Sequence, residues 1–187
     1  VLDTVRQDHL STYGYERNTA PNLTAFSKYA TMYNNAYATS CWTSPSHTSM
    51  FTGLYPSGHK TTQEKWHVED SLTTLAEVLS KQGYQTVGVT GNAVVSSDAG
   101  FGQGFETYEE SWRTKQGPKK RVQGRKQELP TQPRLSIDAY TSNWLETFFE
   151  ERDDKRPLFL FINLIGAHTP YSSCGDNCGI YGAEVEG

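Results

Sequence analysis

The run of residues 158–165, LFLFINLI, constrains the fold of this chain most, because apolar side chains occupy both faces of the strand that it predicts. A strand of this kind is covered by helices on both sides, as in a parallel sheet. A second strand is predicted over residues 85–90 from two valines that share one face. Apolar residues at helical spacing precede these strands, over residues 71–82 and 137–148. Strands that alternate with helices predict an α/β fold, namely an α/β/α sandwich with a mostly parallel central sheet.

Shorter elements are expected elsewhere along the chain. Residues 1–2 have the character of the end of a buried strand. A helix is predicted over residues 21–30 from its apolar spacing, and a short strand over residues 31–37. The helices before the two long strands are expected to stop at Gly83 and at Pro157.

The composition argues against two broad classes of function. The 187 residues include 17 basic and 21 acidic side chains, a formal net charge of -4, so no nucleic-acid partner is expected. No apolar run approaches the ~20 residues of a membrane-spanning helix. The chain begins at Val1 and stops at Gly187 without a closing element, so we expect a domain truncated at both ends. Cytoplasmic and exported locations therefore both stay open.

Two segments have open interpretations. Residues 112–134 are rich in lysine, arginine, glycine and proline, with Glu128 as the single acidic residue. This composition predicts a solvated basic loop insertion, and the alternative is a basic rim that attracts a polyanionic substrate. Cys174 and Cys178 would pair in an exported protein, and otherwise they are two ordinary loop thiols.

The sequence TSPSH at residues 43–47 predicts a tight turn that enters a helix. Pro45 has a φ suited to the first helical turn and needs no amide partner there. The free amides of such a turn favour an anion, such as a phosphate or sulfate ester, beside the Thr43 hydroxyl. A capped helix start without any chemistry is the alternative.

Three further polar residues, Asp3, Asn92 and His168, each lie just past a predicted strand. In parallel α/β sheets, ligands bind at the C-terminal ends of the strands. We therefore expect these side chains to meet Thr43 at one edge of the sheet, which favours a chemical role for the turn.

Several motifs follow one another in a characteristic order. They are LDTVRQDHL at residues 2–10, APNL at 20–23, TSPSHTSMFTG at 43–53, GFE at 104–106 and AHTPY at 167–171. This series resembles the sulfatase family, within the alkaline-phosphatase superfamily. The resemblance implies a partial sulfatase-like catalytic domain over residues 1–187, with a metal-centred site that transfers a sulfuryl or phosphoryl group through a covalent intermediate.

The resemblance also implies roles for individual residues. Asp3 matches the first aspartate metal ligand of the family, whereas Thr4 stands where many sulfatases have a second aspartate. Thr43 occupies the nucleophile position, and threonine has no route to formylglycine, so that group is not expected. Cys41 lies two residues too early to be its precursor. Thr43 is instead predicted to bind the metal and attack as an alkoxide. One or two divalent ions (Ca, Mg, Mn or Zn) are implied as cofactors.

The family pattern extends to the residues around the ester. His47 stands where many sulfatases have arginine and is predicted to be catalytic, the alternative being a histidine on the helix surface. His168 matches a histidine that contacts the anionic oxygens of the substrate, which implies a catalytic and substrate-binding role. Asn92 is predicted to bind substrate as a neutral donor in place of the family's Lys-Trp-His motif. The KWH sequence at residues 65–67 resembles that motif but precedes the helix, so it is not assigned this role.

The sequence therefore predicts a metal-dependent, sulfatase-like hydrolase that cleaves sulfate or phosphate esters through Thr43. One alternative is a phosphoryl transferase of the phosphoethanolamine or phosphoglycerol type. Another is a non-catalytic, anion-binding homologue. The remaining metal ligands of the family are expected beyond Gly187, so the fragment alone is expected to be inactive.

Overall fold

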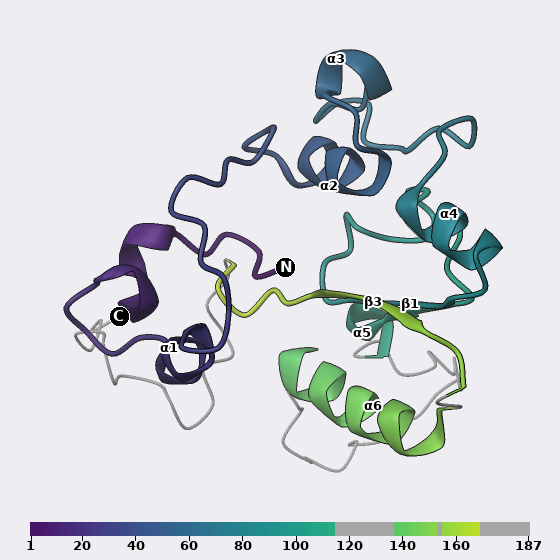
Figure 1. Ribbon diagram of the computed structural model, residues 1–187. Coiled ribbons are helices and arrows are strands. Elements are labelled where there is room, and N and C mark those ends of the chain that lie inside the picture. Colours follow the sequence, from purple (N-terminus) through teal and green to yellow (C-terminus); the bar gives the residue numbers. More distant parts are fainter. Residues whose placement is uncertain (115–136, 153–154, 169–187) are drawn as a thin grey trace, which may run out of the picture.

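The computed structural model describes residues 1–114, 137–152 and 155–168 (Figure 1). In chain order the elements are η1 (Gln7–His9), η2 (Ser11–Tyr13), α1 (Pro21–Ser27), α2 (Thr43–Thr52), α3 (Pro56–His59), α4 (Leu75–Lys81), β1 (Gln85–Thr90), β2 (Thr107–Glu110), α5 (Ser111–Thr114), α6 (Ile137–Glu151) and β3 (Leu158–Asn163).

The central sheet is parallel, with strand order β2-β1-β3. Next to β3, the chain start adds one more parallel step, where Leu2 pairs with Leu164 and the Asp3 amide donates to the Leu164 carbonyl at 2.9 Å. Helices α2 and α4 lie on one side of the strands, and α5 and α6 lie on the other (Figure 1). The predicted α/β/α arrangement and the strand character of residues 1–2 are thus confirmed.

The helices follow from local sequence signals. Helix α1 begins at Pro21, which tolerates the first helical position, but it ends at Ser27 rather than at Ala30. Helix α4 begins at Leu75, four residues later than predicted, because Thr74 and Glu77 form a capping box. In that box the Glu77 amide donates to Thr74 Oγ1 at 3.2 Å, and the Thr74 amide donates to Glu77 Oε2 at 2.7 Å.

Two other predictions are wrong in the described part of the chain. Residues 31–37 form no strand. Tyr33 and Tyr37 are largely exposed there, and a strand needs a neighbour to pair its backbone. Residues 112–114, expected at the start of the basic loop, belong instead to α5. The rest of that loop, together with Cys174 and Cys178, lies outside the described residues.

The hydrophobic core lies between α2, the loops that precede β2 and one face of the sheet. Its buried members are Phe51, Val68, Val95, Ala99, Phe101 and Phe161. The rings of Phe51 and Phe161 meet edge to face, 4.8 Å between centroids, which attaches α2 to β3. Within the described ranges, no helix has the length and apolar character to cross a membrane.

Helix α2 is unusual because its buried face is mostly polar. Ser44, His47, Thr48 and Ser49 are all buried there. Thr48 Oγ1 donates to the Ser44 carbonyl at 2.8 Å, which satisfies one of these groups within the helix. The helix ends at Gly53, whose φ of 71° is a left-handed conformation that glycine adopts without strain. The other buried polar groups of α2 need partners outside the helix, and the partner of His47 lies at the functional site.

Candidate active site

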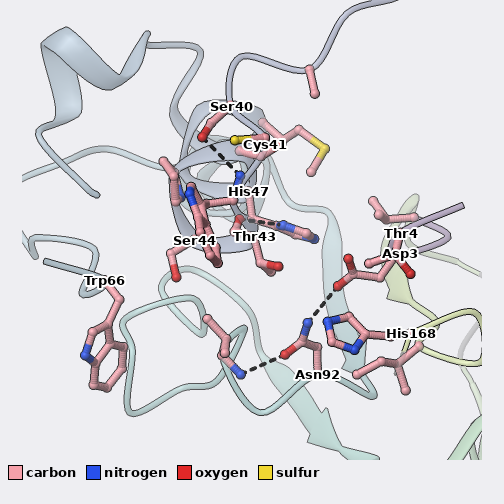
Figure 2. Close-up of a pocket in the computed structure, with 18 of the residues that line it drawn as sticks. Asp3, Thr4, Ser40, Cys41, Thr43, Ser44, His47, Trp66, Asn92 and His168 are labelled. Carbon is pink, nitrogen blue, oxygen red and sulfur yellow. Dashed lines mark hydrogen bonds between the residues drawn. The ribbon is translucent and has the colours of Figure 1, made fainter. Parts of the chain in front are cut away.

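A cavity of about 980 Å³ lies beyond the C-terminal ends of β1 and β3 (Figure 2). All five residues that the sequence singled out line it: Asp3, Thr43, His47, Asn92 and His168. We call it the sheet-edge cavity. The structure therefore brings together side chains from both ends of the described chain, and the roles assigned to them stay predictions.

Asp3 and Asn92 form a buried pair on one side of the cavity. Asn92 Nδ2 donates to Asp3 Oδ2 at 2.6 Å, and Asn92 Oδ1 accepts from the Val94 amide at 2.9 Å (Figure 2). One N–H of the Asn92 amide is thus used to orient the Asp3 carboxylate. The predicted contact between Asn92 and an ester therefore depends on its other N–H.

His47 is buried, so the alternative of a histidine on the helix surface is wrong. Its Nδ1 lies 2.9 Å from the Thr43 main-chain oxygen, and its Nε2 lies 3.2 Å from Asn163 Nδ2. A carbonyl oxygen only accepts, so Nδ1 carries the proton and Nε2 accepts from Asn163. This geometry holds the imidazole in one neutral tautomer. Burial lowers the pKa of His47, which the bond to the Thr43 carbonyl partly opposes.

Two residues that sequence reasoning missed complete this arrangement. Thr90 and Asn163 are the last residues of β1 and β3, face each other in the parallel register and are fully buried. Thr90 Oγ1 lies 3.5 Å from Asn163 Oδ1, and it also accepts from the Asn92 amide at 3.1 Å. A sequence signal did exist, since Asn163 is the one polar residue of the run 158–165 and Thr90 is the last residue of the strand predicted over residues 85–90.

A buried hydrogen-bond network therefore runs across the sheet edge, from the Asp3 carboxylate to the start of α2. In order, its members are Asp3, Asn92, Thr90, Asn163, His47 and Thr43. We call it the sheet-edge network. It sets the position of the predicted nucleophile relative to the predicted metal ligand, although the two residues are far apart in sequence.

Thr43 is the first residue of α2, and Trp42 before it is the N-cap. Trp42 is extended and makes no side-chain cap hydrogen bond, so the alternative of a capped helix start is wrong. The Thr43 side chain is half-buried at the cavity wall. The first helical turn therefore presents backbone amides without a side-chain acceptor, which favours an anion nearby.

The oxygen donors at this edge suit part of a divalent metal site. Hard divalent cations take carboxylate, hydroxyl and carbonyl oxygens, and Asp3 and Thr43, which carry a carboxylate and a hydroxyl, both line the cavity. Among the described residues, no group of three or more His, Cys, Asp or Glu could enclose an ion. Thr4 follows Asp3 with a φ of 60°. Its Oγ1 donates to the Ala167 carbonyl at 2.9 Å, so the hydroxyl proton is used in a backbone contact.

Trp66 is a further wall residue of the sheet-edge cavity. The sequence assigned no role to residues 65–67 because they precede the helix, but the loop that carries them returns to the site. Figure 2 shows the Trp66 indole on the side of the cavity away from Asp3 and His168.

Comparison with known proteins identifies a family and similar folds. The sequence model of the family described as Sulfatase matches residues 1–179. An N-acetylgalactosamine-6-O-sulfatase from Bacteroides thetaiotaomicron is 31% identical over 87 residues, which make up 44% of this chain and 17% of that protein.

Two solved structures have a similar fold. The phosphonate monoester hydrolase of Agrobacterium radiobacter has a TM-score of 0.65 at 18% identity, over 89% of this chain and 40% of that one. The C-terminal periplasmic domain of EcEptC from Escherichia coli, solved in complex with Zn, has a TM-score of 0.62 at 18% identity, over 97% and 46%. The chain thus spans less than half the length of each of these relatives.

Proposed function

The chain belongs to the sulfatase family, and from that membership we propose that it is part of a metal-dependent hydrolase for sulfate or phosphate esters and carries the nucleophile of that enzyme. The observation that carries this proposal is the sheet-edge network. It ties a buried carboxylate, Asp3, to the first turn of α2, where Thr43 lines the same cavity.

In the proposed reaction, Thr43 Oγ attacks the sulfur or phosphorus atom of the ester. A bond from Thr43 Oγ to that atom forms, and the bond to the alcohol oxygen breaks. The electron pair of the broken bond and the Thr43 hydroxyl proton both end on the departing alcohol. Water then attacks the ester on Thr43, which releases sulfate or phosphate and restores the hydroxyl.

The remaining residues hold and orient the ester. His168 and the second N–H of Asn92 donate hydrogen bonds to its anionic oxygens, and His47 positions the Thr43 backbone. Asp3 and Thr43 would hold a divalent cation. When bound, such an ion supplies positive charge against the ester oxygens and lowers the pKa of the hydroxyl.

Threonine chemistry favours a phosphorus centre over sulfate. An ester on Thr43 has no second hydroxyl to expel the sulfuryl group, which is the advantage that formylglycine gives other family members. In-line displacement at phosphorus needs only a positioned oxygen and charge stabilisation. The likeness to relatives named for a sulfatase and for a phosphonate monoester hydrolase supports testing both substrate types.

The Thr43→Ala variant of the intact protein tests this proposal against an aryl sulfate, a phosphate monoester and a phosphodiester. Covalent catalysis predicts loss of all turnover, whereas the matched control Thr73→Ala, at an exposed position before α4, should keep the wild-type rate. Turnover retained in Thr43→Ala would disprove the role of Thr43 as the nucleophile.

If the wild type shows neither turnover nor a bound divalent ion, the non-catalytic alternative holds. If an added alcohol captures the group from Thr43 faster than water, the transferase alternative holds.

A further inference from the structure

We propose that Trp66 forms a stacking subsite for the organic group of the ester, and that this group is a ring with a flat, weakly polar face. The inference rests on the proposed function, because it places the charged part of the ester at Thr43. It deepens that function by naming the kind of alcohol that departs.

The position of Trp66 is the first reason. Trp66 lines the sheet-edge cavity and is 46% exposed, so part of this residue stays uncovered by the protein and is accessible to a ligand. Trp42, Met50 and Val94 are also partly exposed in that lining. Figure 2 shows Trp66 on one side of the cavity, and Asp3, Asn92 and His168 on the other. Trp66 therefore lies across the cavity from the residues that are proposed to hold the ester, where the alcohol of a bound ester would extend.

The fixed backbone around Trp66 is the second reason. On its N-terminal side, the Thr62 amide donates to the Lys65 carbonyl at 2.8 Å, and the Lys65 amide donates to Thr62 Oγ1 at 3.0 Å. On its C-terminal side, Val68 is fully buried and its amide donates to the Ala99 carbonyl at 2.9 Å. A residue anchored on both sides is preorganised, so binding to its exposed ring costs less entropy.

The chemistry of indole selects the ligand. A large aromatic face gains most from a parallel, flat partner, and an acyclic alkyl chain covers less of it. An aryl group and the apolar face of a pyranose sugar both meet this requirement. The aryl ring is flat, and the pyranose chair presents a face of C–H groups; in both, a carbon–oxygen bond can join the organic group to the sulfate or phosphate.

The experiment compares matched esters in the intact protein. Phenyl phosphate, glucose 6-phosphate and n-butyl phosphate carry the same anion on an aryl ring, a sugar ring and a chain, and the three sulfates form a parallel series. Turnover gives kcat/KM, and calorimetry gives Kd. The variants are Trp66→Ala, Trp66→Phe and the control Tyr29→Ala, whose ring is 90% exposed and is not part of the cavity lining.

We expect wild type to prefer at least one ring ester over the butyl ester by about tenfold, as one stacking contact allows. Trp66→Ala should lose that preference, Trp66→Phe should keep part of it, and Tyr29→Ala should keep all of it. The ring ester whose preference over the butyl ester is lost in Trp66→Ala shows whether the subsite binds an aryl ring or a sugar ring. An unchanged preference in Trp66→Ala, or no preference in wild type, would overturn the subsite. If no ester is turned over, the proposed reaction fails, and the calorimetric preference still decides the subsite.

Discussion

At the residue scale, the site depends on where single protons lie. His47 illustrates this, since the sequence predicted a catalytic role for its ring but not the atoms that the ring contacts. The ring contacts the main-chain oxygen of Thr43, and its other nitrogen is occupied by Asn163. Both ring nitrogens are used inside the protein, so we infer that His47 positions the first turn of α2 rather than contacting the ester.

Asn163→Ala tests the sheet-edge network. The variant leaves His47 Nε2 without a donor in a buried place, so we expect the free energy of unfolding of the intact protein to fall by about 1–3 kcal/mol. Urea denaturation measures the change. Asn143→Ala, at an exposed position on α6, is the control and should alter stability little. Equal stability of the two variants would mean that the network does not hold the site together.

At the element scale, α2 is positioned by polar contacts on two sides. Asn163 at the end of β3 binds its histidine, His47. On the other side, His59 of α3 is buried, with its Nε2 3.0 Å from Ser49 Oγ and its Nδ1 accepting from the Thr61 amide at 3.0 Å. The backbone N–H points at Nδ1, so this imidazole is also neutral.

The contact between α2 and α3 should make stability depend on pH. Burial lowers the pKa of His59 below its ordinary value of 6.5, partly opposed by a bond to the Pro45 backbone. Below pH 6.5 the unfolded chain binds a proton that the folded chain resists, so stability falls as pH drops from 6.5 toward the folded pKa. Urea denaturation from pH 8 down to about pH 5 measures the slope. His59→Asn should reduce the slope, with a remainder from His47, whose pKa is also lowered by burial. An unchanged slope would assign the dependence to groups other than His59.

At the scale of the whole molecule, three layers bring distant segments to one sheet edge. The chain start pairs beside β3, so Asp3 lies close to residues that follow β1 and β3. A ligand that binds at this edge contacts several segments at once, and it therefore stabilises the folded state as a whole.

Divalent ions should raise the melting temperature of the intact protein, and a chelator should reverse the rise. An ion at 100 times its Kd adds about 2.7 kcal/mol to the free energy of unfolding. Asp3→Asn should remove most of the shift, because the charge of the carboxylate ligand is lost. Asp70→Asn, at an exposed position, is the matched control and should keep the shift. Differential scanning calorimetry with Mg²⁺, Ca²⁺, Mn²⁺ and Zn²⁺ identifies the ion, and a full shift in Asp3→Asn would exclude Asp3 as a ligand.

The sequence by itself determined the family and the layer order, together with the edge at which Asp3, Thr43, Asn92 and His168 meet. These follow from local patterns, namely strand and helix periodicity, motif order and the rule that strand ends share an edge. Residues 31–37 and the start of α4 show the limit of such patterns, because pairing partners and caps decide these elements.

Only the tertiary structure decided the tautomer of His47, the roles of Thr90 and Asn163, and the place of Trp66 in the cavity wall. The contact between His47 and Asn163 joins residues 116 positions apart, and that between Thr90 and Asn163 joins residues 73 apart. No local pattern encodes such pairs. They exist because packing the layers buries polar atoms that must then find partners across the sheet edge.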